Sequence, residues 1–454
     1  MKKLIILFLI LVIGFIYFQC NSEKAAKSTH ALNWSEDAVI YELFVRDFTP
    51  EGTFRAAMKK IPYLKQTGVD IVWLMPIYPI GQKGRKGSLG SPFSVRNYYE
   101  VNPEFGSKED FKALVDAVHA AGMKIIIGFV PNHSANDYVE MPHHPDWFMK
   151  DDSGNFTREV ADWSDITDFN YDNPQLRDHI KDILAYWIKE FNVDGFRNDV
   201  AGMVPDSFWI DAVAMMRKIK PDIFLLAEWE DKKFIDFGFN SDYSWKTYHI
   251  LKDIYHGKSN VGRLVKAYEE KLDKYGHSAP FMNFIENHDE PRAVLTFSNQ
   301  HIKPFATFIF TVPGRPLLFM GQEFGDTVYS SWRSLFEKEP IDWSNFDSSL
   351  YHIYSTIANL RNEIPISRSK WTPILVDSLN NTLVYSSMAD DKGLLTFLNF
   401  SSRETTISID TPPDFSTFLG RKGIEIFSSK PIPIGKKITV ELKPFDAAVI
   451  LLKK

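Results

Sequence analysis

The stretch that decides the fold is DGFRNDVA, residues 194–201. It begins as a short apolar run and ends in charge, with Arg197 and Asp199 two positions apart. Side chains at positions i and i+2 of a β-strand point to the same face, so both charges would share one small space at the end of a strand. The runs on either side of this stretch indicate which kind of sheet contains it.

Short runs rich in Val, Ile and Phe alternate with stretches of helical spacing from Trp34 onward, which is typical of βα repeats. In one helical stretch, Ser107 is positioned to cap a helix that stops at Gly122. Eight runs are candidate strands: 38–44, 70–76, 124–130, 195–199, 223–229, 237–243, 281–289 and 315–321. Eight such strands predict an α/β fold, a (β/α)8 TIM barrel closed by a parallel sheet.

The domain organisation follows from where this alternation is interrupted. We expect the barrel to span residues 34–364, with a short subdomain, 134–191, inserted after the third strand. A Gly-rich loop within 77–111 is expected to lie over the barrel mouth. Residues 365–454 change to short alternating runs, which predict a C-terminal antiparallel β-sandwich.

Composition excludes one class of partner. The 454 residues include 44% hydrophobic and 24% charged residues, and the formal net charge is −6. Nucleic-acid binding requires a basic stripe, and this balance offers none, so no nucleic-acid partner is expected.

The N-terminus predicts export. Two lysines precede an apolar run from Leu4 to Phe18, so residues 1–20 resemble a signal peptide and 21–33 a polar tether. Cys20 is the only cysteine, which rules out an intramolecular disulfide. Its position directly after the apolar run resembles the lipidated cysteine of bacterial lipoproteins, although YFQC departs from the usual small residues. An uncleaved signal anchor is the alternative, and both place the chain outside the cytoplasmic membrane, on the periplasmic or cell-surface side.

Polar side chains gather at the ends of the predicted strands. Those singled out are Asn132, His133, Arg197, Asp199, Glu228, His288 and Asp289. In a barrel of this kind, catalytic groups lie at the carboxyl ends of the strands, so these side chains are expected to converge on one mouth. Such a concentration of charge is costly to a fold unless it has a function.

This cluster is expected to perform acid–base catalysis with two carboxyl groups that differ in protonation state. Arg197 would stabilise the charged form of Asp199, whereas the apolar ring of Trp229 would desolvate Glu228 and raise its pKa. One charged and one protonated carboxyl group are what glycoside hydrolysis needs.

Four motifs carry a family resemblance: GFVPNH (128–133), GFRNDVA (195–201), LLAEW (225–229) and FIENHD (284–289). Together with YYEVNPEFG (98–106) and PGRPLLFMGQEFG (313–325), they make the chain from Trp34 onward similar to the α-amylase family of glycoside hydrolases. The resemblance implies a retaining enzyme acting on α-1,4-linked glucans such as starch fragments and maltooligosaccharides.

The resemblance also implies roles for single residues. Asp199 would be the nucleophile, Glu228 the general acid/base, and Asp289 the carboxylate that grips ring hydroxyls in the transition state. Further substrate contacts would come from His133, His288, Arg197, Phe93, Arg292 and Trp229. Asn132 and Asp168 match calcium-site positions of the family, so a Ca²⁺ ion is expected there. Trp73, Trp229 and Trp332 are candidate stacking platforms.

Two alternatives remain open at this point. A glucanotransferase or disaccharide mutase of the same family would use the same carboxylates and pass the glucosyl unit to a sugar. A non-catalytic glucan-binding protein would keep only the barrel. Departures from the family pattern at Gly128, Phe93 and Asn97 favour the binding protein, whereas the complete set of three carboxylates favours an enzyme.

Overall fold

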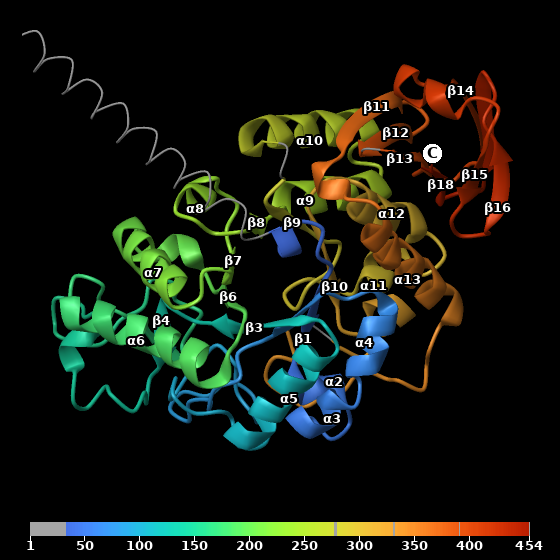
Figure 1. The fold of residues 1–454 in the computed structure, drawn as a ribbon. Helices are drawn as coiled ribbons and strands as arrows, with labels where there is room; N and C mark the ends of the chain where they lie inside the picture. The colour runs from blue at the N-terminus through green and yellow to red at the C-terminus, as the bar shows by residue number, and fades with distance from the viewer. Residues whose placement is uncertain (1–32, 277–278, 330–331, 390, 454) are drawn as a thin grey trace, which may run out of the picture.

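Eight parallel strands form a barrel in the computed structural model (Figure 1), which describes residues 33–276, 279–329, 332–389 and 391–453. The strands are β1 (Ile40–Leu43), β2 (Ile71–Leu74), β3 (Lys124–Phe129), β6 (Gly195–Asn198), β7 (Phe224–Ala227), β8 (Asp242–Tyr243), β9 (Phe281–Asn283) and β10 (Arg315–Phe319). Their order around the sheet is β7-β6-β3-β2-β1-β10-β9-β8, and a parallel bridge from Leu226 to Ser241 joins the two ends. Each predicted run contains one of these strands, so the predicted (β/α)8 barrel is confirmed.

Strand residues alternate between the barrel interior and the surrounding helices, as a period of two requires. On β2, Ile71 and Trp73 belong to the interior apolar cluster, whereas Val72 and Leu74 belong to the larger cluster that includes the helices. Trp73 is only 1% exposed. It is therefore a core residue and not a surface for sugar stacking.

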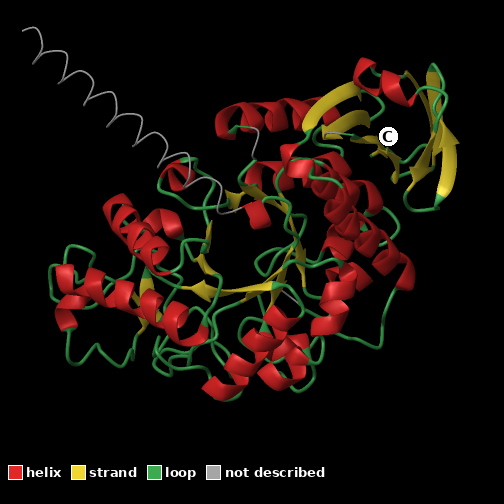
Figure 2. Ribbon diagram, viewed as in Figure 1, coloured by secondary structure: helices red, strands yellow, loops and turns green. Residues whose placement is uncertain are grey.

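Helices surround the strands (Figure 2). They are α2 (Val45–Phe48), α3 (Phe54–Met58), α4 (Ile61–Thr67), α5 (Lys108–Ala120), α6 (Pro174–Phe191), α7 (Asp206–Ile219), α8 (Lys233–Asp236), α9 (Trp245–Tyr255), α10 (Val261–Tyr275), α11 (Ala293–Phe297), α12 (Lys303–Thr311) and α13 (Ser348–Glu363). The predicted cap of α5 is present: the Ser107 side chain accepts from the Asp110 amide, and the Asp110 side chain accepts in return from the Ser107 amide. Gly122, just beyond α5, has the positive φ of 70° that favours glycine.

A small antiparallel sheet interrupts the barrel between β3 and α6. It pairs β4 (His133–Ala135) with β5 (Ile166–Asp168). Residues 134–191, predicted as an inserted subdomain, contain most of this sheet and also α6, which leads into β6. Short 3-10 turns complete the chain: η1 (Asn33–Ser35), η2 (Pro145–Trp147), η3 (Ala201–Met203), η4 (Gln322–Phe324), η5 (Ile366–Arg368) and η6 (Pro413–Phe418).

The C-terminal strands are antiparallel and lie to one side of the barrel, beside α12 and α13 (Figure 1). Six form one sheet in the order β11 (Lys370–Asp377), β12 (Thr382–Ala389), β13 (Lys392–Asn399), β18 (Asp446–Lys453), β15 (Lys422–Glu425) and β16 (Lys430–Pro433). A second sheet pairs β14 (Thr405–Asp410) with β17 (Lys437–Leu442). The two sheets share an apolar core that includes Val384, Phe397, Ile407 and Ile438.

Cys20 and the predicted signal segment lie outside the described residues. Within the part of the chain that the structure does describe, no helix is both long and apolar enough to cross a membrane.

Candidate active site

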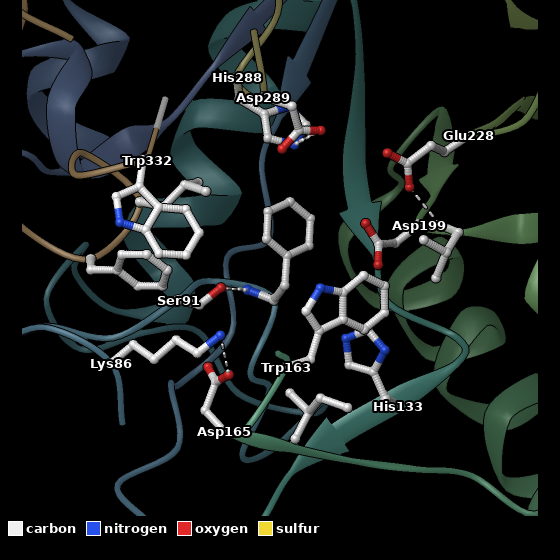
Figure 3. Close-up of a pocket in the computed structure, with 15 residues that line it drawn as sticks. Lys86, Ser91, His133, Trp163, Asp165, Asp199, Glu228, His288, Asp289 and Trp332 are labelled. Atoms are coloured by element: carbon white, nitrogen blue, oxygen red, sulfur yellow. Dashed lines mark hydrogen bonds and ion pairs between the residues drawn. The ribbon is translucent and has the colours of Figure 1, made fainter. Parts of the chain in front are cut away.

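A pocket with a cavity volume of about 260 Å³ opens where the strands of the barrel end (Figure 3). Its lining includes seven of the residues predicted from sequence: Phe93, His133, Asp199, Glu228, His288, Asp289 and Trp332. Two of these continue the strand ladder by one residue. The amide of Asp199 donates to the Phe129 carbonyl at 2.8 Å, and that of Glu228 donates to the Asn198 carbonyl at 3.0 Å. The parallel sheet thus places both carboxyl groups at the same edge.

Arg197 connects these two carboxyl groups from below. Its side chain is 1% exposed, Nη1 lies 2.5 Å from Asp199 Oδ1, and Nη2 lies 2.5 Å from Glu228 Oε1. The third nitrogen, Nε, donates to the Tyr243 hydroxyl at 3.1 Å. A guanidinium presents its donors in a rigid fork, so one arginine can hold two carboxyl groups at a set spacing. The sequence stretch that pairs Arg197 with Asp199 therefore also positions Glu228.

Glu228 is the proton-holding member of the pair. Burial raises its pKa; the Arg197 cation lowers it, but the neighbouring carboxylates Asp199 and Asp289 raise it further, to about 8. Its Oε2 accepts from the amide of Val200 at 2.6 Å. Val200 adopts a left-handed φ of 36°, which is strained for a β-branched residue. This strained turn directs an N–H at the carboxyl group, which is protonated at neutral pH.

The two predicted histidines differ in charge. Burial lowers the pKa of His133, despite the carboxylates around it, so its ring is neutral. That ring lies 5.3 Å from the ring of Trp163. His288 stacks on Phe93, with ring centroids 5.3 Å apart and planes 23° apart, and its Nε2 lies 3.3 Å from Asp289 Oδ2. Phe93 therefore lines the pocket as predicted while also packing on His288.

Three residues predicted to contact substrate lie outside the pocket lining: Arg197, which lies beneath the two carboxyl groups, Arg292 and Trp229. Arg292 is 2% exposed, pairs with Glu286 Oε1 at 2.7 Å and donates to the Met320 carbonyl at 3.0 Å, so it holds the structure beneath the site. That Trp229 covers Glu228 stays a prediction. Its ring lies so close to Gly202 that a Cβ there would meet the indole at 2.2 Å, and Trp229 is 39% exposed.

The rim of the pocket holds residues that sequence reasoning did not single out: Lys86, Ser91, Trp163, Asp165, Ile166, Val200, Leu335 and Phe336. Lys86 lies in the Gly-rich loop predicted over the mouth, and its Nζ lies 3.4 Å from Asp165 Oδ1 in the inserted segment (Figure 3). Trp332, one of the predicted platforms, also lines the pocket and is 69% exposed. The only signal for Lys86 in the sequence was the loop that contains it.

The predicted calcium residues are adjacent, but their donor set is poor. Asn132 Nδ2 lies 3.4 Å from Asp168 Oδ1, and the Glu159 amide donates to Asp168 Oδ2 at 2.7 Å. Among the described residues, no three His, Cys, Asp or Glu side chains form a group that could hold a metal ion. Ca²⁺ takes six to eight oxygen ligands, so the side chains of Asn132 and Asp168 do not hold it by themselves. No step of the chemistry is assigned to calcium.

Comparison with known proteins places this geometry in a family. The family described as "Alpha amylase, catalytic domain" matches residues 21–163 and 136–349. The chain belongs to the alpha-amylase family.

Relatives in this family resemble the chain over most of its length. Alpha-amylase MalA of Haloarcula japonica is 28% identical over 403 residues, which cover 84% of this chain and 58% of that relative. The maltogenic alpha-amylase of Bacillus acidopullulyticus is 25% identical, with 96% of this chain and 80% of the relative covered. Among solved structures, the maltogenic alpha-amylase AmyB from Thermotoga neapolitana has a TM-score of 0.83 at 29% identity, covering 92% of this chain and 99% of its own.

Proposed function

We propose that this chain hydrolyses α-1,4-glucosidic bonds of starch-derived glucans or maltooligosaccharides with retention of anomeric configuration. The observation that carries the proposal is Arg197 held beneath the pocket between Asp199 and Glu228, at 2.5 Å from each. The family match and the names of relatives, which include alpha-amylases and maltogenic amylases, support the substrate class.

Each carboxyl group has one task in the first step. Glu228 gives its proton to the glycosidic oxygen as the bond to the anomeric carbon breaks, and Asp199 attacks that carbon to form a covalent glycosyl ester. The leaving chain departs with the new hydroxyl. Arg197, 2.5 Å from Asp199 Oδ1, orients that carboxylate, while burial raises the pKa of Glu228 so that it retains its proton at neutral pH.

The second step reverses these roles. Glu228, now a carboxylate, takes a proton from water, and the oxygen of that water attacks the anomeric carbon and releases Asp199. The transition state of both steps is electron-poor at the sugar ring, so the carboxylate of Asp289, 44% exposed at the pocket wall, stabilises it.

The decisive experiment follows the anomer released from maltoheptaose by NMR. We expect the α-anomer from the unmodified chain and none from Glu228→Gln, with Glu190→Gln on the exposed surface of α6 as the matched control. Release of the β-anomer, or undiminished release by Glu228→Gln, would refute the mechanism. Adding glucose as an acceptor tests transfer: a larger share of longer products than of hydrolysis would favour a glucanotransferase.

We further propose that the chain is exported and anchored to a membrane by a lipid on Cys20. Support comes from the two lysines, the apolar run and the single cysteine directly after it. Palmitate labelling in a bacterial host should mark the unmodified chain and not Cys20→Ala. Equal labelling of both chains, or of neither, would overturn the proposal.

A further inference from the structure

Glu42 is a buried carboxylate beneath the pocket that the mechanism above does not use. It lies on β1, is 0% exposed, and its Oε1 lies 2.5 Å from Nδ1 of His288. Its other oxygen, Oε2, has no hydrogen-bond partner among the described residues. Burying a carboxylate is costly unless a partner offsets its charge. In the part of the chain that the structure describes, the single hydrogen-bond partner of the Glu42 side chain is His288, so the charge of Glu42 stabilises the protonated form of that histidine.

His288 is held on every side by this arrangement. The flat face of its ring stacks on Phe93, and the ring of Trp73 meets it edge-on at 6.0 Å between centroids. Nδ1 faces Glu42, whereas Nε2 faces Asp289 Oδ2 at 3.3 Å. Glu42, His288 and Asp289 thus form a line that runs from the barrel interior to the pocket.

We propose that Glu42 is a positioning residue that keeps the imidazole of His288 protonated on both nitrogens, so that its Nε2–H donates toward Asp289 and the bound sugar. Carboxylates commonly fix the orientation and the proton of a histidine in this way. The assignment of the sugar rests on the proposed function, whereas the charge of His288 does not.

The charged groups around His288 favour its cationic form. Burial lowers the pKa of His288, but Asp289 and Glu42 raise it, and with Arg197 of β6 opposing them the result is about 9. The charge of Glu42 also raises the pKa of the hydroxyls of Tyr243 and Tyr329. A cation next to an electron-poor transition state would be unfavourable alone. Between two carboxylates it adds no net positive charge.

The test replaces the carboxylate by an amide of the same shape. In Glu42→Gln, ¹⁵N-histidine NMR should show the His288 titration midpoint lowered by at least one pH unit, because the amide carries no charge. The His288 signals are assigned from a His288→Gln spectrum. Glu323→Gln is the matched control: Glu323, in η4 after β10, is also a fully buried glutamate, but it accepts from Tyr41 and Tyr63 and does not line the pocket.

Kinetics give a second readout. For maltoheptaose, kcat/KM of Glu42→Gln should fall about tenfold, the expected result of losing one charge-assisted hydrogen bond, and its pH profile should change shape. Glu323→Gln should keep the profile of the unmodified chain. An unshifted His288 midpoint in Glu42→Gln would overturn the proposal.

The proposal stays testable if Glu42→Gln does not fold. In the unmodified chain at pH 7.5, the ¹⁵N shifts of His288 must show two protonated ring nitrogens, and a neutral ring would overturn it. A further outcome is that the unmodified chain releases no sugar from maltoheptaose while Glu42→Gln still lowers the titration midpoint of His288. That outcome would uphold the role of Glu42 and refute the proposed hydrolysis instead.

Discussion

Glu228→Gln should change how the stability of this protein depends on pH. The folded chain holds the Glu228 proton until about pH 8, whereas the unfolded chain releases it near the ordinary pKa of 4.5. Between these values the folded state binds more protons than the unfolded state, so the stability of the unmodified chain falls as pH rises. This loss of stability is absent below pH 4.5 and complete above pH 8. Glutamine has no proton to lose, so the stability of Glu228→Gln does not fall in this way.

The magnitude follows from the width of that window. Each pH unit inside it changes the free energy of unfolding by about 1.4 kcal/mol, so from pH 5 to 7 the unmodified chain should lose about 2 to 3 kcal/mol relative to Glu228→Gln. Taking the difference in free energy of unfolding between the two chains removes the contribution of every titrating group that the substitution does not affect. The acid needed for catalysis is thus kept at the expense of stability.

Urea unfolding of both chains at pH 5, 6, 7 and 8 measures this difference. Glu190→Gln, which removes an exposed carboxylate from α6, should run parallel to the unmodified chain. If Glu228→Gln also ran parallel from pH 5 to 7, Glu228 would not hold a proton in the folded protein, and its assignment as the acid would be wrong.

Four other outcomes are expected. The kcat/KM for maltoheptaose should fall as pH rises through about 8, because Glu228 then loses the proton it must donate; an alkaline limb near pH 5 would contradict this. Trp332→Ala should raise KM about three- to tenfold with little change in kcat, since it removes an exposed aromatic surface from the rim; an unchanged KM would exclude Trp332 from substrate contact. Lys86→Met should lengthen the products from maltoheptaose by breaking the Lys86–Asp165 pair across the mouth; an identical product distribution would mean that this pair does not limit the substrate. EDTA should leave the Tm unchanged, because the donors at Asn132 and Asp168 are too few for calcium; a fall in Tm restored by CaCl₂ would contradict this.

Much of the fold could be predicted because its signals are local in the chain. The runs around β2 and β3 are continuous apolar stretches, as expected of strands buried on both faces of a parallel sheet, and Ser107 caps the helix between them through a residue three positions away. Each of these signals depends only on near neighbours. The same holds for Asp199 and Glu228, whose positions directly after β6 and β7 place them at the mouth of any barrel that closes in this order.

Sequence reasoning was less successful where a side chain has a choice of partners. Trp229 follows Glu228 directly in the chain, but only the structure shows that its ring packs against Gly202. Arg292 follows Asp289 closely, yet its guanidinium pairs with Glu286 in the interior. Proximity along the chain did not decide either contact.

The sequence by itself determined the order of strands and helices, the residues at each strand end and the likeness of its motifs to one family. Only the tertiary structure decided which charges meet. Arg197 reaches Glu228 as well as Asp199, and Glu42 reaches His288 from 246 positions away. The physical reason is that the pKa of a side chain depends on its burial and on its distance from other charges. Closing the barrel buries Glu228 and His288 and brings strands β1, β6, β7 and β9 to one mouth.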